Sequence, residues 1–273
     1  MRWTERQRAM LQAMGIRLFG PAVAPTAAEA PAAAPRPAPT PAPTPTPTPT
    51  PVQRAAPAAP AAAAVAAMPA AERPISRPDI ATLDWPALRD TVAGCRACAL
   101  CESRQQTVFG VGHLRAHWLI VGEAPGEQED RLGEPFVGDS GKLLDNMLRA
   151  LNLTRDEAGP ERQVYIANTL KCRPPKNRNP DPAETAQCAP FLQRQIALVQ
   201  PRVILAMGRF AAQALLASDE PLGKLRGRVH RYSGVPVVVT YHPAYLLRTL
   251  GDKARAWEDL CLAATIAERM PQA

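Results

Sequence analysis

Three polar or titratable side chains follow short apolar runs of the sequence within two residues. They are Glu123, Asn168 and His242, and the runs end at residues 121, 167 and 240. If these runs are parallel strands, their carboxyl ends meet at one edge of a sheet, where open α/β sheets bind ligands. The pattern predicts a crevice with an amide, an imidazole and an acid cluster, groups suited to proton transfer and hydrogen-bond recognition. The acid cluster consists of Glu123, Glu127, Glu129 and Asp130. The alternative is that Gly, Pro and Asn mark turns here, which explains Asn168 and His242 less well because both abut apolar runs.

The six cysteines form a second group with chemical potential. A C-x-x-C pair lies at 95–98, and Cys172 and Cys188 flank a Pro-rich loop. Without an export signal, such thiols are expected to be buried or to ligate a metal in a reducing compartment. The spacing fits zinc or an iron–sulfur cluster and leaves both open. We expect Cys101 to be structural, although it is an alternative ligand, and Cys261 to be a small core residue.

Several common phosphate-binding and nucleophile motifs are absent from the sequence. No G-x-x-x-x-G-K-[ST] loop occurs, and no G-x-G-x-x-G follows a strand-like run. There is also no G-x-S-x-G nucleophile elbow. These absences disfavour a P-loop nucleotide hydrolase, a nicotinamide-dependent enzyme and a serine hydrolase of the α/β type.

Helical and strand-like runs alternate after residue 84. The periodicity predicts helices at 85–93, 140–151, 182–199, 209–216 and 254–269, and strands at 117–121, 164–167, 203–206 and 235–240. Such alternation indicates a parallel sheet with right-handed crossovers and helices on both faces. The predicted fold is a three-layer α/β/α domain with a four-stranded, mainly parallel central sheet, preceded by a disordered Pro/Ala-rich N-terminal extension.

Composition divides the 273 residues unevenly. Ten of the 21 residues from 31 to 51 are Pro, and such a segment cannot bury enough apolar surface to fold. We therefore expect residues 1–84 to be a short N-terminal helix plus a Pro/Ala/Thr-rich linker, and residues 85–273 to be the folded domain. No run of 18 apolar residues and no secretory signal is present, which predicts a cytoplasmic location. The net charge of +7 permits a polyanionic partner.

Three longer motifs carry a resemblance to a known family. They are GEAPGEQEDRLGEPFVGDSGKLL at 122–144, YIANTLKCRPPKNRNP at 165–180 and HPAYLLR at 242–248. In this order they resemble the family 4 uracil-DNA glycosylases, bacterial and archaeal base-excision repair enzymes with a 4Fe–4S cluster. The resemblance covers about residues 88–268. It implies a cluster held by Cys95, Cys98, Cys172 and Cys188.

The resemblance also implies roles for the crevice residues. Uracil would be bound by Gly122, Glu123, Ala124, Phe136 and Asn168, with Phe136 stacking on the base and Asn168 reading its edge. Catalysis would involve Glu129, Asn168 and His242. His242 would stabilise the uracil anion as a neutral donor. Glu129 would position water, stabilise the cationic sugar or exclude the methyl group of thymine, and the sequence leaves these roles open. Ala124 stands where some related families carry an Asp that activates water.

The expected partner is uracil-containing DNA. Basic residues gather in two loops and are expected to contact phosphates; they are Arg173, Lys176, Arg178, Arg226 and Arg228. The alternatives are two solvated loops, or a non-catalytic iron–sulfur protein that binds DNA or senses redox state on the same fold. A zinc-bearing nucleic-acid module is a third reading. We further expect a nucleoid-associated monomer in a bacterium, and a protein partner for residues 1–20.

Overall fold

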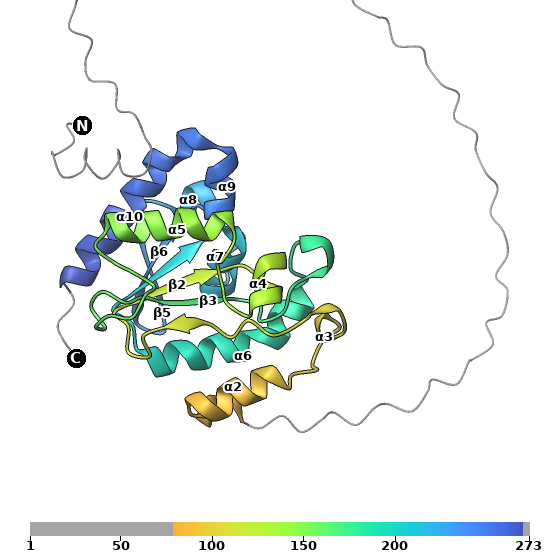
Figure 1. The fold of residues 1–273 in the computed structure, drawn as a ribbon. Helices are drawn as coiled ribbons and strands as arrows, with labels where there is room; N and C mark the ends of the chain where they lie inside the picture. Colours follow the sequence, from red (N-terminus) through yellow and green to blue (C-terminus); the bar gives the residue numbers. More distant parts are fainter. Residues whose placement is uncertain (1–78, 270–273) are drawn as a thin grey trace, which may run out of the picture. The chain divides into compact units, whose positions relative to one another are not determined.

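The structure is a computed structural model that describes residues 79–269 (Figure 1). The expected N-terminal helix and most of the expected linker therefore lie outside the described residues. Residues 79–84, which the sequence analysis assigned to the linker, contain a 3₁₀ turn, η1 (Ile80–Thr82), and Ile80 is buried in a cluster with Leu88 and Phe191. Within the described part of the chain, no helix is long and apolar enough to cross a membrane.

The central sheet contains six strands in the order β1-β3-β2-β4-β6-β5. The strands are β1 (Val111–Gly112), β2 (Trp118–Gly122), β3 (Tyr165–Asn168), β4 (Val203–Met207), β5 (Val229–Tyr232) and β6 (Val235–Thr240). The inner four are parallel, and β1 and β5 pair antiparallel at the two edges. The α/β class and the parallel core are confirmed, but the expected count of four strands was too low.

Both additional strands lack the signal that marks a buried strand. β1 is only two residues long and ends in Gly112, whose φ of 127° favours glycine. β5 alternates between exposed and half-buried positions and includes His230 and Arg231, so it has no continuous apolar run. Edge strands are paired on one side only, and short or charged examples are common because they resist edge-to-edge association.

The expected long helices are all present. They are α2 (Trp85–Ala93), α5 (Asp139–Ala150), α6 (Pro182–Val199), α7 (Arg209–Leu216) and α10 (Lys253–Arg269). Four short helices were not expected: α3 (Leu100–Ser103), α4 (Glu127–Leu132), α8 (Leu222–Leu225) and α9 (Pro243–Arg248). Two 3₁₀ turns, η2 (Pro175–Asn177) and η3 (Leu250–Asp252), complete the described part. Helices of four to six residues are too short for a hydrophobic period to be recognised.

Successive strand residues face opposite layers of the domain. In β2, Trp118 and Ile120 pack in the cluster that contains α5 and α10, whereas Leu119 and Val121 pack in the cluster that contains α6 and α7. Figure 1 shows α5 and α6 on opposite sides of the sheet. All five residues of β2 are buried, as expected for a parallel strand covered on both faces. Helices on both faces leave the strand ends as the accessible edge for a site.

Candidate active site

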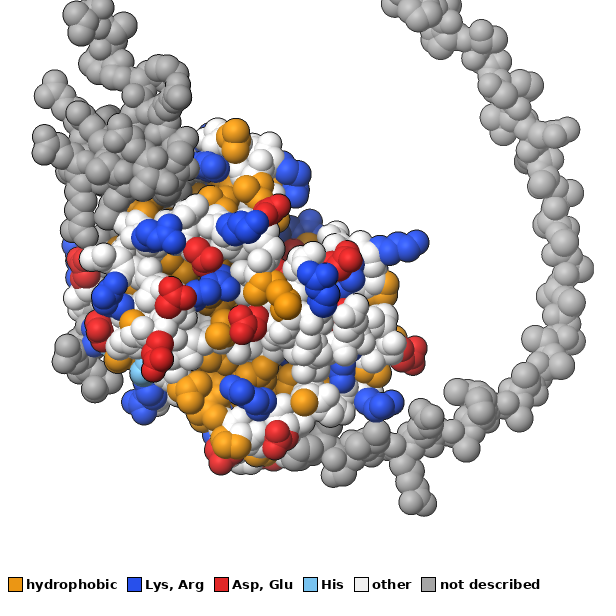
Figure 2. All heavy atoms as spheres, viewed as in Figure 1, with side chains coloured by type: hydrophobic (Ala, Val, Ile, Leu, Met, Phe, Trp, Pro, Cys, Tyr) orange, Lys and Arg blue, Asp and Glu red, His pale blue; other side chains and the backbone are white. Residues whose placement is uncertain are grey.

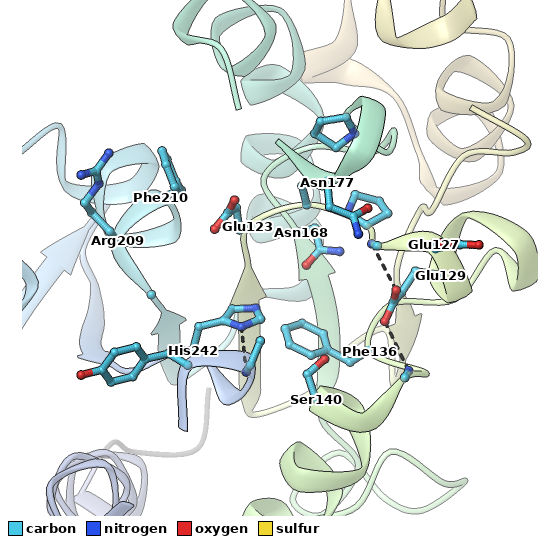
Figure 3. Close-up of a pocket in the computed structure, with 18 of the residues that line it drawn as sticks. Glu123, Glu127, Glu129, Phe136, Ser140, Asn168, Asn177, Arg209, Phe210 and His242 are labelled. Carbon is cyan, nitrogen blue, oxygen red and sulfur yellow. Dashed lines mark hydrogen bonds between the residues drawn. The ribbon is translucent and has the colours of Figure 1, made fainter. Parts of the chain in front are cut away.

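A cleft of about 790 Å³ opens at the carboxyl ends of the parallel strands (Figure 3). The residue after each of these strands, or the last residue of the strand itself, contributes to its lining. Glu123 follows β2, Asn168 ends β3, Gly208 follows β4 and Tyr241 follows β6. Figure 3 shows the side chains of Glu123, Asn168 and His242 grouped around one space with Phe136. The structure thus brings the amide, the imidazole and the acidic residues Glu123, Glu127 and Glu129 into one cleft. Asp130 of the expected acid cluster is instead buried, and its carboxylate accepts from the Gln105 N–H (3.0 Å).

Asn168 lies deep in this cleft beside Gly122. The two residues are register partners at the ends of β3 and β2. A Cβ atom on Gly122 would lie 2.3 Å from the side-chain oxygen of Asn168 and 2.6 Å from the Phe136 ring, so only glycine fits there. The side chain of Asn168 is 2 % exposed, and its Oδ1 has no hydrogen-bond donor among residues 79–269. A buried amide oxygen of this kind is costly unless a ligand supplies the donor.

Phe136 reaches the cleft through an unusual backbone conformation. Its φ of 55° lies in the left-handed region, which disfavours residues with a bulky side chain. Hydrogen bonds fix both neighbouring residues, because Arg155 Nη1 donates to the Pro135 carbonyl (3.2 Å) and the Val137 N–H donates to Glu129 Oε1 (3.1 Å). These bonds hold the Phe136 ring in place although its backbone is strained.

His242 stacks against Phe136 and caps a helix. The ring centroids are 5.4 Å apart and the planes differ by 26°. His242 is the N-cap of α9, and its Nδ1 accepts a hydrogen bond from the Ala244 N–H (3.2 Å). Burial, helped by the Arg248 guanidinium, lowers the pKa of His242 to about 4. At neutral pH the ring is therefore uncharged, and with Nδ1 as an acceptor its proton resides on Nε2.

The two carboxylates of the cleft differ in their surroundings. Glu129 is 9 % exposed, and its oxygens accept from the backbone N–H groups of Gly126 (3.1 Å) and Val137 (3.1 Å). Glu123 is half-buried, and no hydrogen bond to its carboxylate occurs in the described part of the chain. Burial raises the pKa of Glu123 to about 6, against the opposing effect of Arg209. Glu129 therefore shapes the wall, whereas the Glu123 carboxylate is available to a ligand.

Comparison with known proteins agrees with this geometry. Residues 109–261 match the family model of the uracil DNA glycosylase superfamily, which is more than half of the chain. The chain belongs to the uracil-DNA glycosylase superfamily. Among its relatives are the type-4 uracil-DNA glycosylases of Archaeoglobus fulgidus (42 % identity, covering 57 % of this chain and 79 % of the relative) and Thermotoga maritima (40 %, covering 61 % and 84 %). The type-4 enzyme of Pyrobaculum aerophilum is 38 % identical over 66 % of this chain and 93 % of its own length. Within the superfamily, the chain is a member of the type-4 group.

The cysteines of this superfamily member gather around one small cavity. Five of them line it: Cys95, Cys98, Cys101, Cys172 and Cys188. Two N–H groups point at sulfur atoms, since Arg104 Nη1 donates to Cys172 Sγ (3.0 Å) and the Lys171 N–H donates to Cys188 Sγ (3.3 Å). Within residues 79–269, no three His, Cys, Asp or Glu side chains converge closely enough to hold a single metal ion. Cys261 lies instead in α10 and packs against the core.

The loop between β3 and α6 places one of its basic residues on the cleft. Arg178 lines the cleft, and its guanidinium makes two hydrogen bonds with the carboxylate of Glu184 (2.6 and 2.9 Å). Arg173 bridges Asn177 (2.8 Å) and Glu127 (3.3 Å) at the rim. Lys176 is exposed and adopts a φ of 53°. Hydrogen bonds therefore fix Arg178 on the cleft, and they fix Arg173 against two residues that line it.

The second basic group lies away from the cleft lining. Arg226 is enclosed between Asp259 (2.6 Å) and the ring of Tyr241, with its guanidinium carbon 4.2 Å from the ring centroid. Arg228 pairs with Glu220 (2.7 Å) on the surface. Arg226 therefore supports a wall residue of the cleft.

Sequence reasoning overlooked several lining residues. They are Ser140, Asn177, Arg209, Phe210, Tyr245 and Arg248. Arg209 is separated from the end of β4 by Gly208 and lies three residues beyond the expected strand end at 206, so the rule that selected Glu123 does not reach it. Ser140 and Asn177 come from a helix and a 3₁₀ turn outside the strands, and no local pattern marks them.

Proposed function

We propose that this chain excises uracil from DNA by hydrolysing its N-glycosidic bond, which releases free uracil and leaves an abasic site. The observation that carries the proposal is the buried Oδ1 of Asn168, which has no donor among the described residues and faces a space bounded by Phe136. The N3–H of uracil supplies the missing donor, and the Asn168 amide group donates to O4. Cytosine presents the opposite polarity at both positions and is rejected. Phe136 stacks on the extruded base.

The reaction breaks the bond between C1′ of the sugar and N1 of uracil. The bonding electrons leave with uracil, whose O2 gains negative charge, and the sugar becomes cationic. The neutral His242 ring donates from Nε2 to O2 and so stabilises the leaving anion. Water adds to C1′ and loses a proton, and the uracil anion takes up a proton in turn, so that the products are neutral uracil and the abasic sugar.

The hydrogen bonds of Glu129 favour a supporting role for this carboxylate. Because its oxygens accept backbone N–H groups on both sides of the Phe136 loop, Glu129 holds the wall against which the base stacks. The Glu123 carboxylate, which has no such partners, then orients the attacking water or stabilises the cationic sugar. The resemblance implies instead that Glu129 assists catalysis. A comparison of the excision rates of Glu123→Gln and Glu129→Gln distinguishes the two assignments.

The overall proposal is tested by single-turnover cleavage of a labelled oligonucleotide that contains one uracil. We expect free uracil and an alkali-labile abasic site, and no product from the same oligonucleotide with cytosine or thymine. An iron-loaded, DNA-binding preparation that releases no uracil would contradict the proposal and support the non-catalytic alternative.

We also propose that Cys95, Cys98, Cys172 and Cys188 hold a 4Fe–4S cluster. Four thiols surround one cavity without converging on a point, which suits a cluster whose irons each take one thiolate better than a single tetrahedral zinc ion. When bound, the cluster would supply a rigid covalent link between the segment after α2, the basic loop and α6. The Lys171 N–H would donate to the Cys188 thiolate, and the Arg104 guanidinium to the Cys172 thiolate.

A matched pair of cysteine variants tests the ligand set. Cys188→Ser is expected to lower iron and sulfide content well below the roughly four of each per chain that such a cluster carries. Cys101→Ser, which alters a cysteine of the same cavity, is expected to retain them. Elemental analysis of anaerobically purified protein makes the measurement. Stoichiometric zinc in the wild type, or equal iron loss in both variants, would contradict this ligand set.

We propose that DNA is contacted through the basic loop at Arg173, Lys176 and Arg178. The face that carries α5 intermixes basic and acidic side chains (Figure 2), as in the Lys142–Asp139 pair, so it offers no extended basic surface. By contrast, Arg178 of this loop lines the cleft, and Arg173 and Lys176 adjoin the lining residues Pro174 and Asn177 in sequence. Phosphates that flank an extruded base would pass there. Arg228 is more distant, and Arg226 acts through Tyr241.

Lys176→Gln is expected to weaken binding to uracil-containing DNA and to reduce the slope of log affinity against log salt by about 1, because one phosphate contact is lost. The excision rate of fully bound substrate should be unchanged. Arg162→Gln is the control, since Arg162 is exposed beyond the amino end of β3. Binding titrations at several salt concentrations make the measurement, and an unchanged slope for Lys176→Gln would remove this residue from the DNA contact.

A further inference from the structure

A buried lysine lies between the amide-bearing strand end and the cysteine cavity. Lys171 follows Asn168 by three residues and immediately precedes Cys172, and it is 1 % exposed. Its Nζ donates to the Asn168 carbonyl (2.8 Å) and to Gln195 Oε1 (2.7 Å). Among residues 79–269, no carboxylate lies within ion-pair distance of this ammonium. A buried cation without a counter-charge is strongly destabilising, so the position requires an explanation.

The partners of Lys171 are themselves fixed. Gln195 is fully buried in α6, and its Nε2 donates to the Phe109 carbonyl (2.9 Å) and to the Tyr165 hydroxyl (3.1 Å). The ammonium therefore joins α6 to the end of β3 through a network with satisfied acceptors. One of those acceptors is the peptide carbonyl of Asn168, whose side chain faces the cleft.

Two cysteines lie next to Lys171. Its own N–H donates to Cys188 Sγ (3.3 Å), Cys172 is its neighbour in sequence, and Lys171 lines the same cavity as both. A thiolate-ligated iron–sulfur cluster carries net negative charge, so its presence would provide the counter-charge that the described residues do not.

We propose that Lys171 is a positioning residue that couples the cysteine-ligated centre to base recognition. Its ammonium balances the negative charge of the centre and at the same time holds the carbonyl of Asn168, so that one side chain serves both the centre and the strand end that carries the base-reading amide. This inference rests on the proposed function and cluster. It adds a residue that touches neither uracil nor iron but affects both sites.

The test compares Lys171→Met, which removes the charge and keeps much of the length, with Lys171→Arg, which keeps the charge. Lys142→Met, at an exposed lysine of α5, is the control. All are studied as the full chain, purified anaerobically. In Lys171→Met we expect a more negative reduction potential of the centre, because removing a nearby positive charge disfavours electron addition. We also expect single-turnover excision to be about tenfold slower, because one hydrogen bond from a charged donor is lost. The affinity for DNA should be unchanged.

The Arg variant separates charge from packing. Iron content and reduction potential should lie closer to the wild-type values in Lys171→Arg than in Lys171→Met. If Lys171→Met fails to load iron, the expectation for iron content still holds. Equal impairment of both variants would indicate packing alone and overturn the proposal, as would a wild-type potential and rate in Lys171→Met. A wild type that binds no iron overturns it as well. A wild type that binds iron but releases no uracil refutes the proposed function. In that case the reduction potential of the variants still tests whether Lys171 balances the charge of the centre.

Discussion

Asn168→Ala is expected to lower single-turnover uracil excision about a thousandfold. The variant loses both hydrogen bonds to the base and leaves the N3–H of uracil buried without an acceptor, each a loss of about 1–3 kcal/mol. The melting temperature should be unchanged or higher, because the wild-type Oδ1 is buried without a donor among the described residues. Removing such a group relieves a cost in the free protein. Thermal unfolding beside the excision assay measures both effects.

Asn146→Ala provides the matched control, since Asn146 is an exposed asparagine of α5 whose side chain contacts only Arg149 among the bonds described. It should excise uracil at the wild-type rate. An Asn168→Ala protein that also excised at the wild-type rate would leave the glycosylase intact and discard the assignment of base reading to this amide. A large drop in melting temperature would instead show that the amide is structural.

The buried strands and long helices could be predicted from sequence because their signals are local. β4 is the uninterrupted apolar run Val203–Met207, and α6 begins at Asp181, whose side chain accepts from the Ala183 N–H (2.8 Å), with Pro182 in the first turn. The crevice could be predicted from the strand ends alone, because the pairing of two parallel strands places Asn168 beside Gly122. Motif resemblance then supplied the roles that we propose for Phe136 and His242.

The remaining features depend on contacts between residues whose spacing carries no period. The bond from the Val137 N–H to Glu129 spans eight residues, and it follows Phe136, whose backbone is left-handed. Likewise, nothing in the sequence indicates that Lys171 is buried, since lysine is usually exposed and its partner Gln195 lies 24 residues away. Such bonds form only once the layers are assembled, so they could not be predicted from local patterns.

His242→Ala is expected to lower the single-turnover rate about 10²–10³-fold, the usual effect of removing one donor to a developing anion. DNA affinity should change little, because the negative charge on O2 appears only as the bond breaks. His242→Ala also removes the ring that stacks on Phe136, so Phe136→Leu serves as a comparison that keeps the imidazole. Rapid-quench kinetics with saturating enzyme separates the chemical step from binding. A weakened affinity with an unchanged chemical rate would contradict the assignment of His242 to leaving-group stabilisation.

The pH dependence distinguishes the imidazole from the carboxylate. With a pKa of about 4, His242 stays neutral as pH falls from 8 to 5, so its donor capacity persists across this range. Glu123, with a pKa of about 6, gains a proton over the same range and loses the negative charge that assists water or the cationic sugar. The wild-type rate should therefore fall as pH drops through about 6. Glu123→Gln should be slower and flat across this range, whereas His242→Ala should be slower but keep the same acid limb. An acid limb that disappeared in His242→Ala and survived in Glu123→Gln would reverse the two assignments.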